Sequence, residues 1–250
     1  MKRFIFLVSL ILQLACLGQT ELSSEEVLED YYILKSALIK AHPSLYDYTT
    51  SSEWDSIFQV VEKDVLRTVN SRNDFYKVLV ELTDHAHDGH LMVMRPPMDP
   101  LPNFFPLHLV VIDEKFYTDV ADQGIPLGSE VLSIDGVSSV EIRNRMLKYA
   151  PSDGYNTTKK DRQIEREFGI LHFYEFGAKA SYLVRFKSPS GEQSEALVES
   201  ASFESIGQRF SQRSSLQGRR TQQPEPHVQL IDSLNTAVLT LNSFHLETEE

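Results

Sequence analysis

The chain has 250 residues, a formal net charge of −12, and a composition that is 41% hydrophobic and 10% aromatic. These values are ordinary for a globular protein with one large domain or two small ones. The acidic charge argues against nucleic acid and anionic membrane surfaces as partners, because both carry negative charge themselves.

The first eighteen residues have the pattern of a secretory signal peptide. Lys2 and Arg3 precede an apolar run, Phe4 to Leu12, and the segment 13–18 ends in small residues. The apolar run is shorter than the roughly 20 residues that a membrane-spanning helix needs, and no later segment reaches that length. We therefore expect residues 1–18 to be removed and the protein to be exported to the periplasm or the extracellular space, with no integral membrane span.

Cys16 is the single cysteine of the chain. Cleavage before Gln19 would remove it and would exclude disulfides from the mature protein. A lipid anchor at Cys16 is the alternative, because Leu14-Ala15-Cys16 is a partial lipobox, although Gln13 stands where a branched apolar residue is expected.

Residues 19–95 are predicted to form a helical N-terminal domain. Capping patterns open three helices, at Ser23 to Glu26, Thr50 to Glu53 and Ser71 to Asp74, and His42-Pro43 ends the first of them. Apolar residues at helical spacing follow each cap, and they indicate a core face: Val27, Tyr31, Leu34, Leu38 and Ala41; Trp54, Ile57, Phe58, Val61 and Val65; Phe75, Val78, Leu79 and Leu82. A short strand is expected at Leu91 to Met94.

Residues 96–199 are predicted to form a β-rich domain. Five prolines between Pro96 and Pro106 indicate a stiff connector. Short apolar runs then alternate with turn residues from Leu107 to about Val198, and one helix, Ser139 to Tyr149, interrupts them. Within this block, Gly128 to Gly136 precedes that helix and resembles the G-x-x-I-x-x-I-N/D-G phrase of bacterial PDZ domains. Such domains bind peptide C-termini by adding a strand to a sheet edge. Another small β-barrel with an Asp-Gly hairpin is the alternative.

Residues 200–230 are rich in Ser, Gln and Arg, and they are predicted to be a polar linker. The arginines of this segment are expected to be solvated: Arg209, Arg213, Arg219 and Arg220. A new strand is expected to begin at Thr236, which indicates that a further domain starts in residues 231–250.

Three histidines, His85, His87 and His90, lie within six residues, and clustered imidazoles are typical zinc ligands. Their order, H-x-H-D-x-H, departs from the H-x-H-x-D-H pattern of metallo-β-lactamases, because the aspartate comes one place early. A zinc hydrolase is therefore ranked last, and we expect no cofactor and no metal.

The order of these parts is similar to that of bacterial S41 serine peptidases, the tail-specific and tricorn-like group. The resemblance is carried by His42-Pro43-x-Leu45-Tyr46 in the helical part, Asp88-Gly89-His90 after it, the prolyl connector and the PDZ-like block. It implies a polypeptide substrate and makes His90 the candidate general base, since an imidazole accepts a proton near neutral pH. Asp88-Gly89 is otherwise a simple helix-ending turn, and a serine–lysine branch of the family would not use His90.

The sequence contains neither a G-x-S-x-G elbow nor an S-x-x-K pair, so the residues that expose and activate a serine are missing from it. The resemblance places the nucleophile beyond Glu250, and we expect this chain to be inactive alone. The predicted fold class is α+β: a helical N-terminal domain, a PDZ-like β domain and the first strand of an incomplete α/β protease domain. The alternative function is a non-catalytic peptide-binding module.

Overall fold

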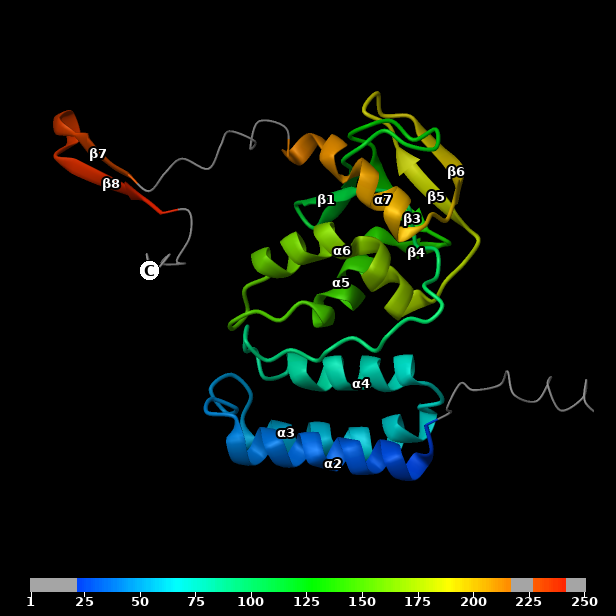
Figure 1. The fold of residues 1–250 in the computed structure, drawn as a ribbon, viewed down its shortest axis with the longest axis vertical. Helices are drawn as coiled ribbons and strands as arrows, with labels where there is room; N and C mark the ends of the chain where they lie inside the picture. The colour runs from blue at the N-terminus through cyan, green and yellow to red at the C-terminus, as the bar shows by residue number, and fades with distance from the viewer. Residues whose placement is uncertain (1–21, 217–226, 242–250) are drawn as a thin grey trace, which may run out of the picture.

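The computed structural model describes residues 22–216 and 227–241. The expected signal peptide, Cys16 and Gln19 lie outside these ranges. The described chain is an α+β protein, with a layer of helices beneath a unit that combines further helices with an antiparallel sheet (Figure 1). This agrees with the predicted fold class. Within the described part, no helix is both long and apolar enough to cross a membrane.

The three predicted N-terminal helices are confirmed as α2 (Ser24–Ala41), α3 (Ser51–Val60) and α4 (Arg72–Asp84). Each begins at its predicted cap, because the hydroxyls of Ser23, Thr50 and Ser71 accept the backbone N–H three residues later. One π-helical turn, η2 (Val61–Val65), and one 3₁₀ turn, η3 (Leu66–Thr68), lead from α3 toward α4. These caps are satisfied by residues only three positions away, so the sequence alone predicts them well.

The sheet has the strand order β1-β2-β3-β5-β6, all antiparallel, with β4 paired to the far end of β3. Its strands are β1 (Leu109–Ile112), β2 (Lys115–Thr118), β3 (Glu130–Ile134), β4 (Val137–Ser138), β5 (Ser181–Lys187) and β6 (Gln193–Glu199). Asp135 and Gly136 form the predicted tight turn between β3 and β4, with φ values of +51° and +84°. Helix α5 (Ser139–Met146) follows at once, and the 3₁₀ turn η4 (Leu147–Tyr149) extends it.

A second long helix, α6 (Thr158–Phe176), lies in the region for which only one helix was predicted. That prediction was wrong. The apolar residues Ile164, Phe168 and Leu171 share one helical face and are buried, but charged residues stand between them. Several of those charged residues are themselves buried in ion pairs. The sequence therefore looks polar, and the helical spacing of its buried apolar residues is not apparent from it.

The segment predicted as a polar linker is partly helical: α7 (Phe203–Arg209), η5 (Phe210–Gln212) and η6 (Ser214–Leu216). The expectation that its arginines are solvated is wrong for Arg213. The guanidinium of Arg213 is buried and donates to Asp119 at 2.6 Å, and Arg209 pairs with Asp122. Arg219 and Arg220 lie outside the described residues.

The strand predicted at Thr236 is confirmed as β8 (Thr236–Thr240). It pairs with β7 (His227–Ile231) through the turn η7 (Asp232–Leu234), so it is not an orphan strand. Its assignment to the start of a protease domain stays a prediction. The strand expected at Leu91 to Met94 is absent there, since those described residues have no strand pairing.

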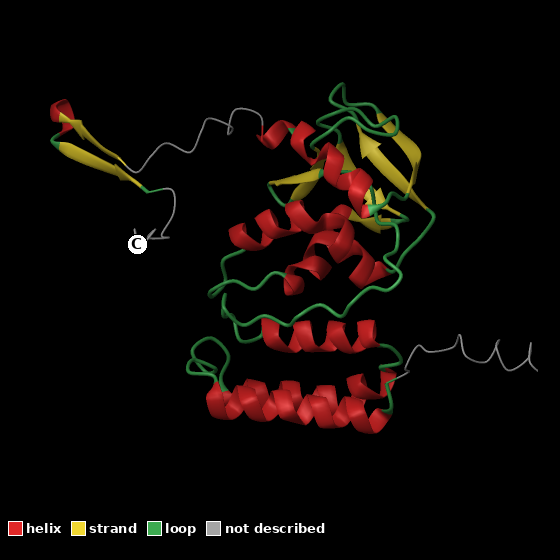
Figure 2. Cartoon of the chain, viewed as in Figure 1, coloured by secondary structure: helices red, strands yellow, loops and turns green. Residues whose placement is uncertain are grey.

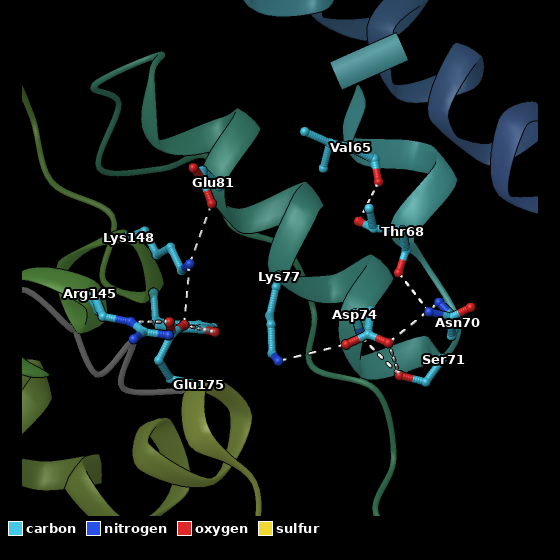
Figure 3. Close-up of polar contacts among 11 residues, drawn as sticks. Val65, Thr68, Asn70, Ser71, Asp74, Lys77, Glu81, Arg145, Lys148 and Glu175 are labelled. Atoms are coloured by element: carbon cyan, nitrogen blue, oxygen red, sulfur yellow. Dashed lines mark hydrogen bonds and ion pairs between the residues drawn. The ribbon is translucent and has the colours of Figure 1, made fainter. Parts of the chain in front are cut away.

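Helix α4 lies between the other N-terminal helices and the sheet unit (Figure 2), and it contributes to two cores. Phe75, Val78 and Leu82 pack with α2 and α3, whereas Tyr76 and Val80 pack with the sheet unit. Charged side chains join the same layers: Lys148 lies 3.4 Å from Glu81 of α4 and 3.2 Å from Glu175 of α6, and Arg145 donates to Glu175 at 2.7 Å (Figure 3). The segment that follows α4 runs between this helix and the sheet unit (Figure 1).

Candidate active site

The three clustered histidines occupy different surroundings. His85 ends α4 and lies edge-on to the Trp54 ring. His87 has a positive φ of +49° and its ring contacts Tyr48 and Tyr155, with ring centroids 5.9 and 4.8 Å away. The His90 side chain is 92% exposed. The imidazoles do not converge on one point, so the zinc site considered for His85, His87 and His90 is not assembled.

Asp88 lies between two imidazoles. Its Oδ1 accepts the backbone N–H of His90 at 2.7 Å and is 3.3 Å from His90 Nδ1, while its Oδ2 is 3.2 Å from His42 Nε2. The hydrogen bond from the backbone of His90 lowers the pKa of the Asp88 carboxyl more than its partial burial raises it. Asp88 is therefore a carboxylate at neutral pH, and it places negative charge beside the exposed imidazole of His90.

His42 does more than end the first helix, which was its predicted role. Its side chain is only 8% exposed, and its Nδ1 accepts the backbone N–H of Ser44 at 3.3 Å. With Nδ1 as acceptor, the neutral ring carries its proton on Nε2, which faces Asp88. Nε2 is close to Asp88 Oδ2 but lies outside hydrogen-bond direction, so this buried nitrogen has no hydrogen-bond partner. The imidazole and the carboxylate are therefore in close contact without a hydrogen bond between them.

The loop between η4 and α6 holds the Asp88-Gly89-His90 turn. Asp153 of this loop accepts the N–H of Gly89 at 2.8 Å, Gly154 donates to the carbonyl of His87 at 2.8 Å, and Lys159 donates to the carbonyl of Gly89 at 3.2 Å. A Cβ at residue 89 would lie 2.9 Å from Asp153 Oδ1, so only glycine permits this contact without a shift. Sequence reasoning missed Asp153, which is 64 residues away and carries no local motif.

The arrangement suits proton transfer at the surface. His90 presents an accessible imidazole next to a carboxylate, and this is the chemistry of a general base. Among the described residues, no hydroxyl or thiol hydrogen-bonds to His90, so a nucleophile would have to approach from the open side. The peptide-binding role predicted for the PDZ-like domain, residues 96–199, stays a prediction.

No family model matches the sequence, and no curated protein matches it significantly. Among solved structures, a serine-to-alanine mutant of CPAF, a chlamydial serine protease, matches with 17% identity and a TM-score of 0.51, over 72% of this chain and 34% of that chain. Mature CPAF complexed with lactacystin matches with 16% identity and a TM-score of 0.45, over 71% of this chain and 35% of that one.

The tricorn protease matches with 14% identity and a TM-score of 0.25, over 78% of this chain and 19% of that chain. The chain spans about a third of the length of the CPAF structures. About 72% of the chain therefore has a fold similar to that of one part of the protease CPAF.

Proposed function

We propose that this chain is part of an exported serine-type peptidase of the S41 kind, in which His90 is the general base. The observation that carries the proposal is the exposed His90 imidazole beside the Asp88 carboxylate, in a chain whose fold is similar to part of a serine protease. The substrate is a polypeptide, and the PDZ-like domain, residues 96–199, is the proposed docking place for a peptide C-terminus.

The nucleophilic serine is proposed to come from a segment that is not among these 250 residues, because no activated-serine motif occurs in them. In this proposal the serine approaches the open side of His90 and gives its proton to the imidazole. The chain alone would bind peptides without cutting them.

Labelling of the whole gene product with a fluorophosphonate tests the base assignment. We expect labelling in the unaltered protein and a loss of at least a hundredfold in His90→Ala, because removal of a general base costs about 10²–10⁴ in rate. His227→Ala, a histidine on the β7–β8 hairpin, is the matched control and should label normally. Normal labelling of His90→Ala would instead assign the base to another residue, such as a lysine.

A non-catalytic peptide-binding module is the second candidate, and the absence of a serine motif from the sequence favours it. Binding of the chain to peptides that end in a free carboxylate, but not to their amidated forms, together with no fluorophosphonate labelling of the whole gene product, would identify it. Export is tested separately: the first residue of the secreted protein should be Gln19, and a mature protein that begins at Met1 would contradict it.

A further inference from the structure

Three side chains around the Asp88-Gly89-His90 turn present ligand atoms that all lie within 4.8 Å of one another: Asp88, His90 and Asp153. We propose that they form a binding site for one divalent transition-metal ion, of which Zn²⁺ is the representative. This site is distinct from the one considered for His85, His87 and His90, since it takes a single histidine and adds an aspartate from a different part of the chain.

The spacing of one pair of ligand atoms fits such an ion. Two ligand atoms that each lie about 2.0–2.1 Å from a tetrahedral zinc ion are separated by about 3.3 Å. His90 Nδ1 and Asp88 Oδ1 are 3.3 Å apart. The two atoms can therefore coordinate one ion without a change in their separation, and Asp153 supplies a third ligand from the opposite loop. Water completes the coordination on the open side.

The buried imidazole of His42 beside the cluster gives independent support for the metal site. His42 Nε2 is buried without a hydrogen-bond partner and is 3.2 Å from the second oxygen of Asp88. Metal-ligating carboxylates are commonly held by such an outer partner, which fixes their orientation and adds to affinity. In a metal complex, a slight rotation of Asp88 would give His42 the hydrogen bond that it lacks and leave Oδ1 on the ion.

The scaffold around the cluster is already ordered by other contacts. Gly89 donates to Asp153 at 2.8 Å, and Gly154 donates to the carbonyl of His87 at 2.8 Å, so the two ligand-bearing segments are joined without a metal. The ion would add a link between the end of α4 and the loop before α6. The two carboxylates balance its charge, whereas Lys159, held on the carbonyl of Gly89, is the nearby cation that weakens the site.

The donor set decides the class of ion. One imidazole with two carboxylates suits Zn²⁺, Mn²⁺ and similar ions, whereas Ca²⁺ and Mg²⁺ prefer sites built from oxygen alone. If His90 is the general base, as in the proposed function, a metal on Nδ1 leaves the His90 proton on Nε2. The ring then has no free lone pair for a serine proton, so the ion holds the peptidase in an inactive form.

Calorimetric titration of the purified, tag-free chain with Zn²⁺ tests the site. We expect one ion per chain, a binding at least tenfold weaker in Asp153→Asn and in His90→Gln, and no comparable binding of Ca²⁺. Asn at residue 153 still accepts the N–H of Gly89, so the fold contact is kept while the charged ligand is lost. Asp113→Asn, in the exposed β1–β2 turn, is the matched control and should bind as the unaltered chain does.

Binding that is unchanged in both cluster variants, or no Zn²⁺ binding up to millimolar concentration, would overturn the metal site. Circular dichroism of each variant excludes misfolding as the cause of a loss. The regulatory consequence has its own readout: fluorophosphonate labelling of the whole gene product should fall at least tenfold with Zn²⁺ and return with a chelator. Tight Zn²⁺ binding by the unaltered chain together with normal labelling of His90→Ala would support the metal site and contradict the assignment of His90 as the general base.

Discussion

Arg213 is a buried cation on which three elements converge. Its guanidinium donates to Asp119 at 2.6 Å, to the carbonyl of Glu165 at 3.1 Å and to the carbonyl of Leu109 at 3.0 Å. Burial opposes ionisation of Asp119, but hydrogen bonds from Ser215 and Arg213 outweigh it and hold the pKa of Asp119 below its ordinary value. The pair therefore stabilises the fold at neutral pH, and that stabilisation is lost only as the pH falls below about 4.

Removal of the Arg213 guanidinium should destabilise the fold. Arg213→Ala leaves the Asp119 carboxylate buried and unpaired, so we expect a loss of about 3–5 kcal/mol in the free energy of unfolding. Arg185→Ala is the control, because Arg185 and Glu195 form a pair whose side chains are 54% and 56% exposed, and such pairs contribute about 0–1 kcal/mol. Urea unfolding at pH 7.5 measures both. Equal losses in the two variants would contradict the assignment.

His172 is a buried histidine that should make the stability of the fold depend on pH. Its ring is buried among the aromatic side chains of Phe105, Phe168, Phe176 and Tyr182, and its Nδ1 has no hydrogen-bond partner. Burial disfavours the charged form and lowers the pKa of His172 from 6.5 to about 4. Below about pH 6.5, His172 therefore takes up a proton in the unfolded state but not in the folded state. Its contribution to the free energy of unfolding is complete above about pH 6.5 and is lost as the pH falls toward 4.

His172→Phe keeps the aromatic contacts and removes the titrating group. Between pH 7.5 and pH 4.5, the unaltered chain should lose about 2–3 kcal/mol more stability than the variant does. Urea unfolding at the two pH values measures this difference. His85 and His108 are also held below their ordinary pKa by burial, but they are present in both proteins and cancel in the comparison. An identical pH dependence of the two proteins would refute the role of His172.

At the scale of elements, the close approach of α6 to the chain before β1 depends on one glycine. A Cβ at Gly169 would lie 2.8 Å from the carbonyl oxygen of Phe105 and 3.2 Å from the Cβ of Phe104. Gly207 offers the opposite case, since it lies inside α7 and a Cβ there would meet nothing within 4 Å. Alanine at Gly169 and alanine at Gly207 therefore separate the effect of close packing from the effect of helix propensity.

Gly169→Ala should destabilise the protein by about 1–3 kcal/mol, because the helix must move away from a backbone carbonyl that is itself held in the core. Gly207→Ala should instead stabilise it by up to about 1 kcal/mol, since alanine favours the helix and nothing is displaced. Thermal and urea unfolding give both values. A stabilising Gly169→Ala would show that α6 does not lie against Phe105 as described.

At the scale of the whole molecule, α4 couples the helical layer to the sheet unit. Tyr76 leaves α4 on the side away from α2 and α3, and its ring contacts Tyr149 and Tyr174 with centroids 5.8 and 4.9 Å away. The charged group of Glu81, Lys148, Glu175 and Arg145 crosses the same boundary (Figure 3). We expect the two layers to unfold together because one helix belongs to both cores.

Tyr76→Ala should weaken that coupling. We expect a loss on the order of 3–5 kcal/mol, as for other buried aromatic residues, and a calorimetric transition that broadens or divides in two. Tyr32→Ala, on the exposed side of α2, is the control and should cost less than about 1 kcal/mol with a single transition. A single sharp transition in Tyr76→Ala would mean that the layers remain coupled without this ring.

The features that could be predicted from the amino-acid sequence are those whose partners are close along the chain. The caps at Ser23, Thr50 and Ser71, the apolar faces of α2 to α4 and the Asp135-Gly136 turn each depend on contacts within a few residues. The sequence also singled out His90 as a candidate base, a role that stays a prediction.

The arrangement of the buried charges and of the candidate site depends on contacts between distant parts of the folded chain. The sequences of α6 and of the segment around Arg213 look polar, because the partners that neutralise their charges are far away along the chain. Asp119, for example, is 94 residues from Arg213. The neighbourhood of His90 likewise joins His42, Asp88 and Asp153 from three segments. Burial of a charge is favourable only when its partner is in place, and folding of the whole chain supplies that partner.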